Sequence, residues 1–204
     1  ACALLNRGVE YIEVRVLDVD PFDSNGISKN TALFVEAMLM TCFDNDFNDY
    51  SQEKVTIAKQ NLTTVAIEGR KPNLSVLKPN GEKVGLKDYA LELFENIEST
   101  AKQMGQEYLD AVLVEKQKVF DSRKTPSAKL IKLAKEKGYK NTVLDISKEV
   151  SKEFRNYKLS DVDNNTLKNK VQESIEIEKS LSSSDKISLA EYIDMYYQSA
   201  DGCC

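Results

Sequence analysis

Hydrophobic and polar positions follow a strand-like pattern at three places in the first part of the chain. Residues 9–17 are rich in β-branched and aromatic side chains and predict a strand. Residues 63–68 predict a second, shorter strand. Residues 74–85 hold two short apolar stretches around a Pro-Asn-Gly turn and predict a small hairpin. The first part of the chain is therefore expected to contain antiparallel strands.

Helical patterns surround these strands and take over completely near residue 86. Residues 29–43 predict a helix capped by Ser28 and apolar nearly all round, which we expect to be deeply buried. Ser51 can cap a short helix that ends near Lys59. Five apolar residues further on repeat at helical spacing and form one face: Ala90, Phe94, Ile97, Ala101 and Met104. Further helices are predicted over 107–120, 126–137, 144–157, 166–181 and 190–197.

The order of these elements predicts an α+β fold with two regions. Residues 1–86 would form a sheet domain with a buried helix, and residues 87–204 a helical region. The second region contains the clearest sequence signals for where helices begin. Thr125 precedes proline at a helix start, and Ser188 with Glu191 forms a capping box before the last helix.

Composition excludes several classes of function. The chain has 204 residues and a net charge of −5, and an acidic chain without a basic stripe argues against nucleic-acid binding. No apolar run approaches the ~18 residues of a membrane span. The four cysteines form no C-x-x-C pair, so we expect a reduced, cytoplasmic protein without a zinc site or a disulfide framework. Because histidine is absent, chemistry here must rest on carboxylates, Arg, Lys, Tyr and a metal ion.

The strand at residues 9–17 contains the best candidate site. Side chains alternate along a strand, so Glu13 and Arg15 share the face opposite the apolar one and lie ~6–7 Å apart. A carboxylate can hold Mg²⁺, and an arginine can clamp a phosphate. Spacing alone favours a solvated or salt-bridged pair, which is common on the wet face of a sheet. Glu68 and Arg70 repeat this spacing, and there we expect solvated charges.

A longer sequence motif around Glu13 and Arg15 favours a binding site over a solvated ion pair. The run from Ala3 to Phe22, which includes Tyr-Ile-Glu-x-Arg and Asp-x-x-Pro-Phe, closely resembles a signature of bacterial glutamate–cysteine ligases. Residues 61–72 are similar to a second motif of that family, and residues 120–130 to a later segment. The final helix, 190–197, falls where that family ends. The resemblance covers essentially the whole chain, although it is loose beyond residue 140.

The resemblance implies an enzyme that joins the γ-carboxylate of glutamate to the amine of cysteine, the first step of glutathione biosynthesis. ATP first converts the carboxylate to an acyl phosphate, on an antiparallel sheet like that of glutamine synthetase. By the same resemblance, Glu13 is a magnesium ligand and Arg15 contacts the ATP phosphates. No catalytic residue is assigned.

The family's other magnesium ligands and its cysteine pocket would lie upstream of this chain. We therefore expect a C-terminal fragment, inactive without the upstream half of the same enzyme. Two alternatives stay open. One is a related carboxylate–amine ligase with another amine acceptor, and the other is a non-catalytic helical interaction domain over residues 87–200. Alanine at Glu13 and Arg15 would abolish activity in a ligase and change nothing in the interaction domain.

Overall fold

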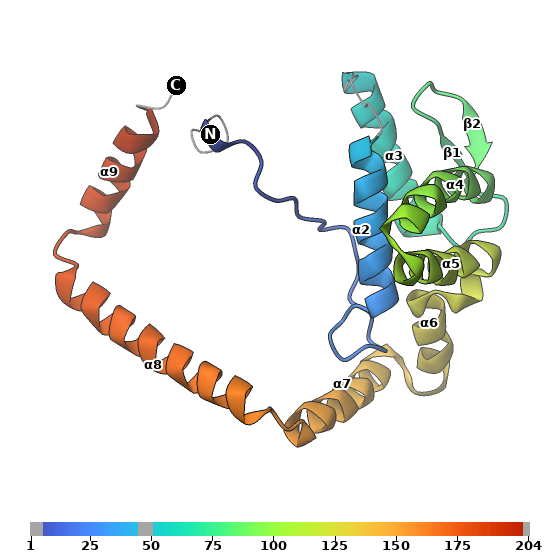
Figure 1. The fold of residues 1–204 in the computed structure, drawn as a ribbon. Helices are drawn as coiled ribbons and strands as arrows, with labels where there is room; N and C mark the ends of the chain where they lie inside the picture. Colours follow the sequence, from blue (N-terminus) through green and yellow to red (C-terminus); the bar gives the residue numbers. More distant parts are fainter. Residues whose placement is uncertain (1–5, 45–50, 202–204) are drawn as a thin grey trace. The chain divides into compact units, whose positions relative to one another are not determined.

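The structure is a computed structural model that describes residues 6–44 and 51–201 (Figure 1). It clusters into two compact units, one of residues 18–152 and one of residues 1–17 with 153–204. Helices dominate both, and the described strands form one two-stranded antiparallel sheet. The α+β class is thus confirmed in its coarse form, while the division at residue 86 stays a prediction. The elements, in chain order, are α2 (Lys29–Asp44), α3 (Gln52–Glu68), β1 (Ser75–Leu77), β2 (Lys83–Gly85), α4 (Leu86–Met104), α5 (Gln106–Phe120), η1 (Ser122–Lys124), α6 (Pro126–Lys137), α7 (Tyr139–Asn156), α8 (Asp161–Ser184) and α9 (Leu189–Asp201).

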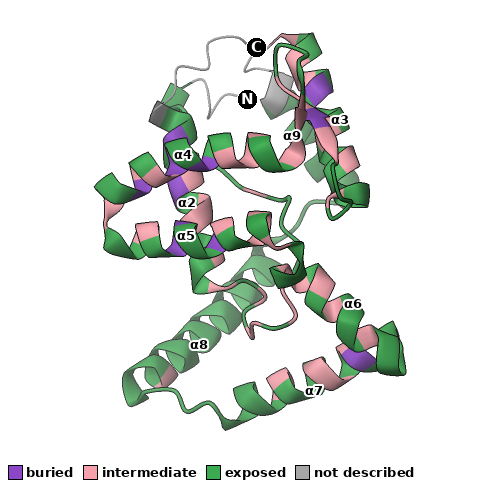
Figure 2. Cartoon of the chain, turned by 90° about the vertical axis from the view of Figure 1, so that its right-hand side faces the viewer, coloured by how far each residue is buried: buried purple, intermediate pink, exposed green. Residues whose placement is uncertain are grey.

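The core of the 18–152 unit lies where α2, α4 and α5 meet. Helices α4 and α5 lie side by side, joined at Gly105, and both contact α2 (Figure 2). Phe94 is 7% exposed and stacks on Phe34 of α2, with ring centroids 5.3 Å apart. Ala37 and Ala101 are fully buried, which lets the helix backbones approach closely. The helical face predicted around Phe94 is therefore confirmed as the core.

A buried carboxylate joins α2 to α5 within this unit. Glu115 is 9% exposed, and it accepts hydrogen bonds from Thr31 Oγ1 at 2.9 Å and from Lys118 Nζ at 2.5 Å. A buried charge is tolerated only when it is paired in this way. Ser28 caps α2 as predicted, because its hydroxyl accepts from the Thr31 amide at 3.1 Å.

The expectation that α2 is deeply buried is wrong for this chain. Ala37 and Thr41 are buried, but Met40 is 42% exposed and Phe43 is 84% exposed. Helices α4 and α5 cover one side of α2, and no other described element has comparable contact with it. An apolar helix face without a neighbour stays in solvent, whatever its composition.

The short strand predicted over residues 63–68 is also wrong, because these residues continue helix α3. Ser51 caps α3 as predicted, and its hydroxyl accepts from the Lys54 amide at 3.3 Å. Asn61 then docks the helix on the hairpin, donating to the Leu77 carbonyl at 2.7 Å and accepting from the Leu77 amide at 3.0 Å. A helix already begun and anchored adds one hydrogen bond per residue, which outweighs the weak strand preference of Thr and Val.

The predicted hairpin is confirmed as β1 and β2, with Val76 opposite Val84. Its turn closes when the Gly81 amide donates to the Lys78 carbonyl at 2.9 Å. Gly81 has a φ of 83°, which glycine adopts without strain. The Asn80 side chain accepts from the Glu82 amide at 3.0 Å, as expected for asparagine in a turn.

The longest predicted strand, residues 9–17, does not form. Residues 8–20 have no regular secondary structure, and Ile12 and Val16 are 69% and 66% exposed. A strand needs a neighbour to accept and donate its backbone hydrogen bonds, and no described residue pairs with this segment. The sequence carries the alternation of a strand without the sheet that would stabilise it.

The helix ends of the second half follow their sequence signals. Thr125 caps α6, with Pro126 at its first position, and its hydroxyl accepts from the Ala128 amide at 3.3 Å. Helices α7 and α8 are longer than predicted. No helix among residues 6–44 and 51–201 is long and apolar enough to cross a membrane.

The capping box before α9 gives a pH-dependent prediction. Glu191 accepts from the Ser188 amide at 2.7 Å and from the Ser188 hydroxyl at 2.8 Å. These two bonds, the backbone one first, hold the pKa of Glu191 below its usual range. Since the folded-state pKa is the lower one, the bonds stabilise the helix start above the ordinary glutamate pKa of ~4.3 and are lost as pH falls through the depressed value.

We expect Ser188→Ala to raise the pKa of Glu191 toward its ordinary value, measured by NMR titration of the side-chain carboxyl carbon. The backbone bond remains in this variant, so the rise should be partial. An identical midpoint in the parent and the variant would contradict the capping box.

Candidate functional site

The candidate site lies on the extended segment of residues 8–17. Arg15 Nε donates to Glu13 Oε2 at 2.7 Å, and Arg15 Nη2 contacts the same oxygen. The two side chains therefore lie on the same side of the backbone, as the alternation predicted. Both are accessible, with 83% of the Arg15 side chain and 46% of the Glu13 side chain exposed.

This ion pair fits both interpretations of the site. Exposed ion pairs contribute little to stability, so the fold does not depend on this one. The pairing is what a solvated pair would show. It also leaves Glu13 Oε1 free of described partners and Arg15 reachable from solvent, as a site open to metal and phosphate requires.

The donor set at Glu13 fits part of a magnesium site. Mg²⁺ is commonly held by one or two carboxylates together with water and substrate phosphates. Glu13 supplies one carboxylate, and the described residues form no group of three or more His, Cys, Asp or Glu side chains that could hold a metal ion. Among the described residues, Glu13 could therefore supply one carboxylate ligand, and no larger cluster accompanies it.

A hydrogen-bonded turn follows the segment, near the start of the 18–152 unit. The Asp20 amide donates to the Gly26 carbonyl at 2.8 Å, and the Asp20 side chain accepts from the Phe22 amide at 3.0 Å. Gly26 has a φ of 76°, in the left-handed region that favours glycine.

The second charged stretch lies at the end of α3. Lys71 Nζ pairs with Glu68 Oε2 at 3.0 Å, which agrees with the solvated charges expected there. Arg70 has no partner among the described residues, and it lines a hollow together with Lys87 and Lys118. Sequence reasoning missed this grouping because the three cations are far apart in the chain, and no local motif marks them.

The cysteines add no site that the structure describes. Cys42 is a free, exposed thiol. The predictions for Cys2, Cys203 and Cys204 lie outside the described residues.

Comparison with known proteins decides the family. A family model described as glutamate–cysteine ligase matches residues 1–65. The glutamate–cysteine ligase of Pseudomonas syringae pv. syringae (strain B728a) is 31% identical over 192 residues, which cover 91% of this chain and 36% of that protein. That of Pseudomonas paraeruginosa (strain DSM 24068 / PA7) is 36% identical over 165 residues, which cover 78% of this chain and 31% of that protein. The chain belongs to the glutamate–cysteine ligase family.

A solved glutamate–cysteine ligase matches over the whole chain. The crystal structure of the enzyme from Francisella tularensis in complex with AMP has a TM-score of 0.94 and 57% sequence identity. The match covers 100% of this chain and 41% of that one. The chain thus spans less than half the length of these glutamate–cysteine ligases, and it corresponds to their C-terminal part. The family predicted from residues 3–22 is confirmed.

Proposed function

We propose that this chain is the C-terminal part of an enzyme that ligates the γ-carboxylate of glutamate to the amine of cysteine. ATP would activate the carboxylate as an acyl phosphate, in the first step of glutathione biosynthesis. The observation that carries the proposal is the match over the whole chain to the Francisella enzyme, at 57% identity. The AMP in that structure supports ATP as the co-substrate. We also propose a cytoplasmic location, where ATP and a reduced cysteine thiol are both available.

Glu13 and Arg15 are the residues of this chain that we assign to the reaction. Arg15 would bind ATP phosphate oxygens bidentately, exchanging its bond to Glu13 for a bond to the ligand. Glu13 would then be released to hold Mg²⁺, which when bound neutralises negative charge on the phosphates. The segment would acquire its strand form within a glutamine-synthetase-like sheet, whose other strands lie upstream.

The exposed helices of the 153–204 part support an upstream partner. Every residue of α9 whose side chain is described is exposed. Every residue of α8 except Asn164 is exposed as well (Figure 2). Soluble proteins seldom expose so much apolar side chain without a partner to cover it. The exposed apolar residues of α8 and α9 are Val162, Leu167, Val171, Ile175, Ile177, Leu181, Leu189, Tyr192, Ile193, Met195, Tyr196 and Tyr197.

Those apolar positions indicate where the upstream half would pack. Leu167, Val171 and Ile175 follow one another at intervals of four residues, so they share one side of α8. The missing part of the enzyme is large enough to cover them, because this chain covers 41% of the Francisella enzyme. We therefore propose the upstream half as the partner that completes both the fold and the site.

The proposal is tested by following ATP turnover with the chain assembled with its upstream half. Glutamate and cysteine together should give γ-glutamylcysteine and ADP in equal amounts, with a higher kcat/KM for cysteine than for glycine, alanine or 2-aminobutyrate. If the folded assembly has a higher kcat/KM for another amine, the protein is instead a related carboxylate–amine ligase. Turnover with none of these amines would contradict the ligase assignment itself.

A further inference from the structure

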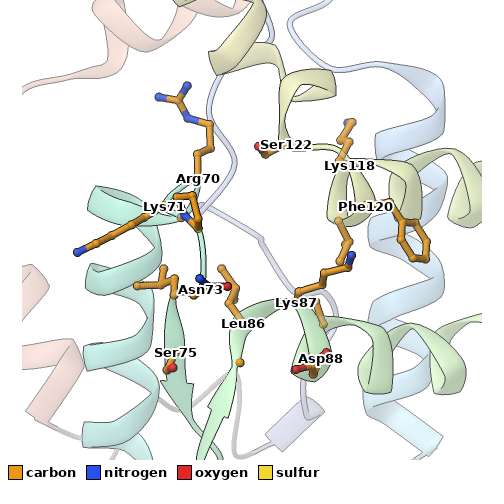
Figure 3. A pocket seen from close by; sticks show the side chains of 16 residues that line it. Arg70, Lys71, Asn73, Ser75, Leu86, Lys87, Asp88, Lys118, Phe120 and Ser122 are labelled. Atoms are coloured by element: carbon orange, nitrogen blue, oxygen red, sulfur yellow. The ribbon is translucent and has the colours of Figure 1, made fainter.

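A hollow of about 780 Å³ opens in the 18–152 unit (Figure 3). It lies between the end of α3, the hairpin, the first turn of α4 and the end of α5. This volume falls within the ~300–1,000 Å³ typical of small-molecule sites. Glu13 and Arg15 do not line it, and they belong to the other unit.

The lining of the hollow is strongly positive, although the chain as a whole carries a charge of −5. Its charged side chains are four cations and one carboxylate: Arg70, Lys71, Lys87, Lys118 and Asp88. A concave surface with one sign of charge concentrates counter-ions from solution. A positive hollow in an acidic protein therefore favours an anionic ligand.

Two of these cations have no carboxylate partner among the described residues, and a third is partly accessible. Arg70 has no partner among the described residues. The ammonium of Lys87 lies 5.3 Å from the centre of the Phe120 ring and has no carboxylate partner in the described part of the chain. Lys118 is shared with the buried Glu115 and keeps 27% of its side chain exposed. Lys71, by contrast, pairs with Glu68 and points away from Lys87 and Lys118 (Figure 3).

The remaining wall offers a hydroxyl and an apolar surface. Ser122 lines the hollow, and no described residue bonds its hydroxyl. Leu86, Val119 and Phe120 supply apolar contact. Asp88, in the first turn of α4, already offsets the positive end of that helix, so the anion belongs on the opposite wall.

We propose that this hollow binds a phosphate-bearing small molecule through Arg70, Lys87, Lys118 and Ser122. The planar guanidinium matches two phosphate oxygens, and the two ammonium groups add charge from the other side. The apolar wall, and a volume larger than one phosphate group needs, favour an organic phosphate over the inorganic ion. Neither the proposed ligation site nor the upstream partner is needed for this inference.

Isothermal titration at low ionic strength tests the inference, on the chain and on its assembly with the upstream half. The probes are phenyl phosphate, inorganic phosphate and succinate. We expect phenyl phosphate to bind most tightly, because its ring reaches the apolar wall. Arg70→Ala and Lys87→Ala should each weaken its binding on the order of 10-fold, the usual cost of a lost charge-assisted bond. Far-UV circular dichroism checks that both variants remain folded.

Lys102→Ala is the matched control for charge. Lys102 is an exposed lysine in the last turn of α4, ~22 Å along the helix from Lys87, so its loss should leave binding unchanged. If Lys102→Ala weakened phenyl phosphate binding as much as Arg70→Ala and Lys87→Ala do, the net charge of the protein would explain the loss. That result would overturn the proposed site. No binding of any probe to the folded chain, or loss of binding in the assembly, would also overturn it. Arg15→Ala should bind phenyl phosphate normally, which separates this site from the proposed function.

Discussion

Arg15→Ala is expected to lower the kcat/KM of the proposed ligation, measured on the chain assembled with its upstream half, by roughly 10³-fold while leaving the fold intact. Phosphoryl transfer depends on neutralising the charge of the phosphates, and a guanidinium is the side chain best shaped for that task. In this structure Arg15 is 83% exposed and contacts only Glu13 among the described residues. Its removal therefore has little structural effect of its own. The measurement is steady-state ADP release, with thermal unfolding recorded in parallel.

Arg123→Ala is the matched control for this variant. Arg123 also pairs with a carboxylate two residues away, with its Nε 2.8 Å from Asp121 Oδ1, and 89% of its side chain is exposed. Its loss should leave kcat/KM near that of the parent. If both variants lose activity equally, Arg15 has no special role.

Glu13→Gln tests the proposed magnesium-binding role of Glu13 separately from the proposed phosphate-binding role of Arg15. This variant keeps the size of the side chain and removes the charge, so we expect the Mg²⁺ concentration needed for half-maximal activity to rise. An unchanged Mg²⁺ dependence would contradict the assignment of Glu13 as a ligand.

Phe94→Ala should give the largest loss of stability, about 3–5 kcal/mol in the free energy of unfolding. The ring is 7% exposed and stacks on Phe34 between α2 and α4. Its neighbours Ala37 and Ala101 are too small to fill the space it would leave. Since whole domains are stable by only ~5–15 kcal/mol, this change would remove a large share of the stability of the 18–152 unit. Urea unfolding followed by circular dichroism measures it.

Phe43→Ala provides the comparison on the same helix as Phe34. Phe43 is 84% exposed in this structure, so its removal should change the free energy of unfolding by less than ~0.5 kcal/mol. Similar losses for Phe94→Ala and Phe43→Ala would mean that the core is not where the structure places it.

Local signals predicted the helices well because each helix contains its own hydrogen bonds. The capping residues Ser28, Ser51 and Thr125 all accept the backbone bonds expected of them. The face around Phe94 became the core because its spacing matches the helical period. Such features need no distant part of the chain.

The strands were harder to predict because a strand is completed by its neighbours. Residues 9–17 have the alternation of a strand, yet no strand among the described residues pairs with them, since the one described sheet holds only β1 and β2. Residues 63–68 have the residue types of a strand, yet they form the last part of helix α3. That helix is capped at Ser51 and continues without a break to Glu68. Asn61, which holds that helix on the hairpin, gives no signal in the sequence.

The candidate sites, too, could be predicted from the sequence only where their residues are close together in the chain. Alternation correctly placed Glu13 and Arg15 on one side of the backbone, and the family resemblance gave them roles. The hollow lined by Arg70, Lys87 and Lys118 had no signal, since the three cations are far apart in the sequence and line one hollow only in the folded chain.

The most direct test of the account is ATP turnover with glutamate and cysteine in three samples: this chain alone, the upstream half alone, and the two together. We predict γ-glutamylcysteine only from the mixture, because the proposed site takes Glu13 and Arg15 from this chain and its other ligands from the upstream half. Turnover by this chain alone would contradict the divided site. Turnover by the upstream half alone, undiminished without this chain, would contradict any part for Glu13 and Arg15 in the reaction.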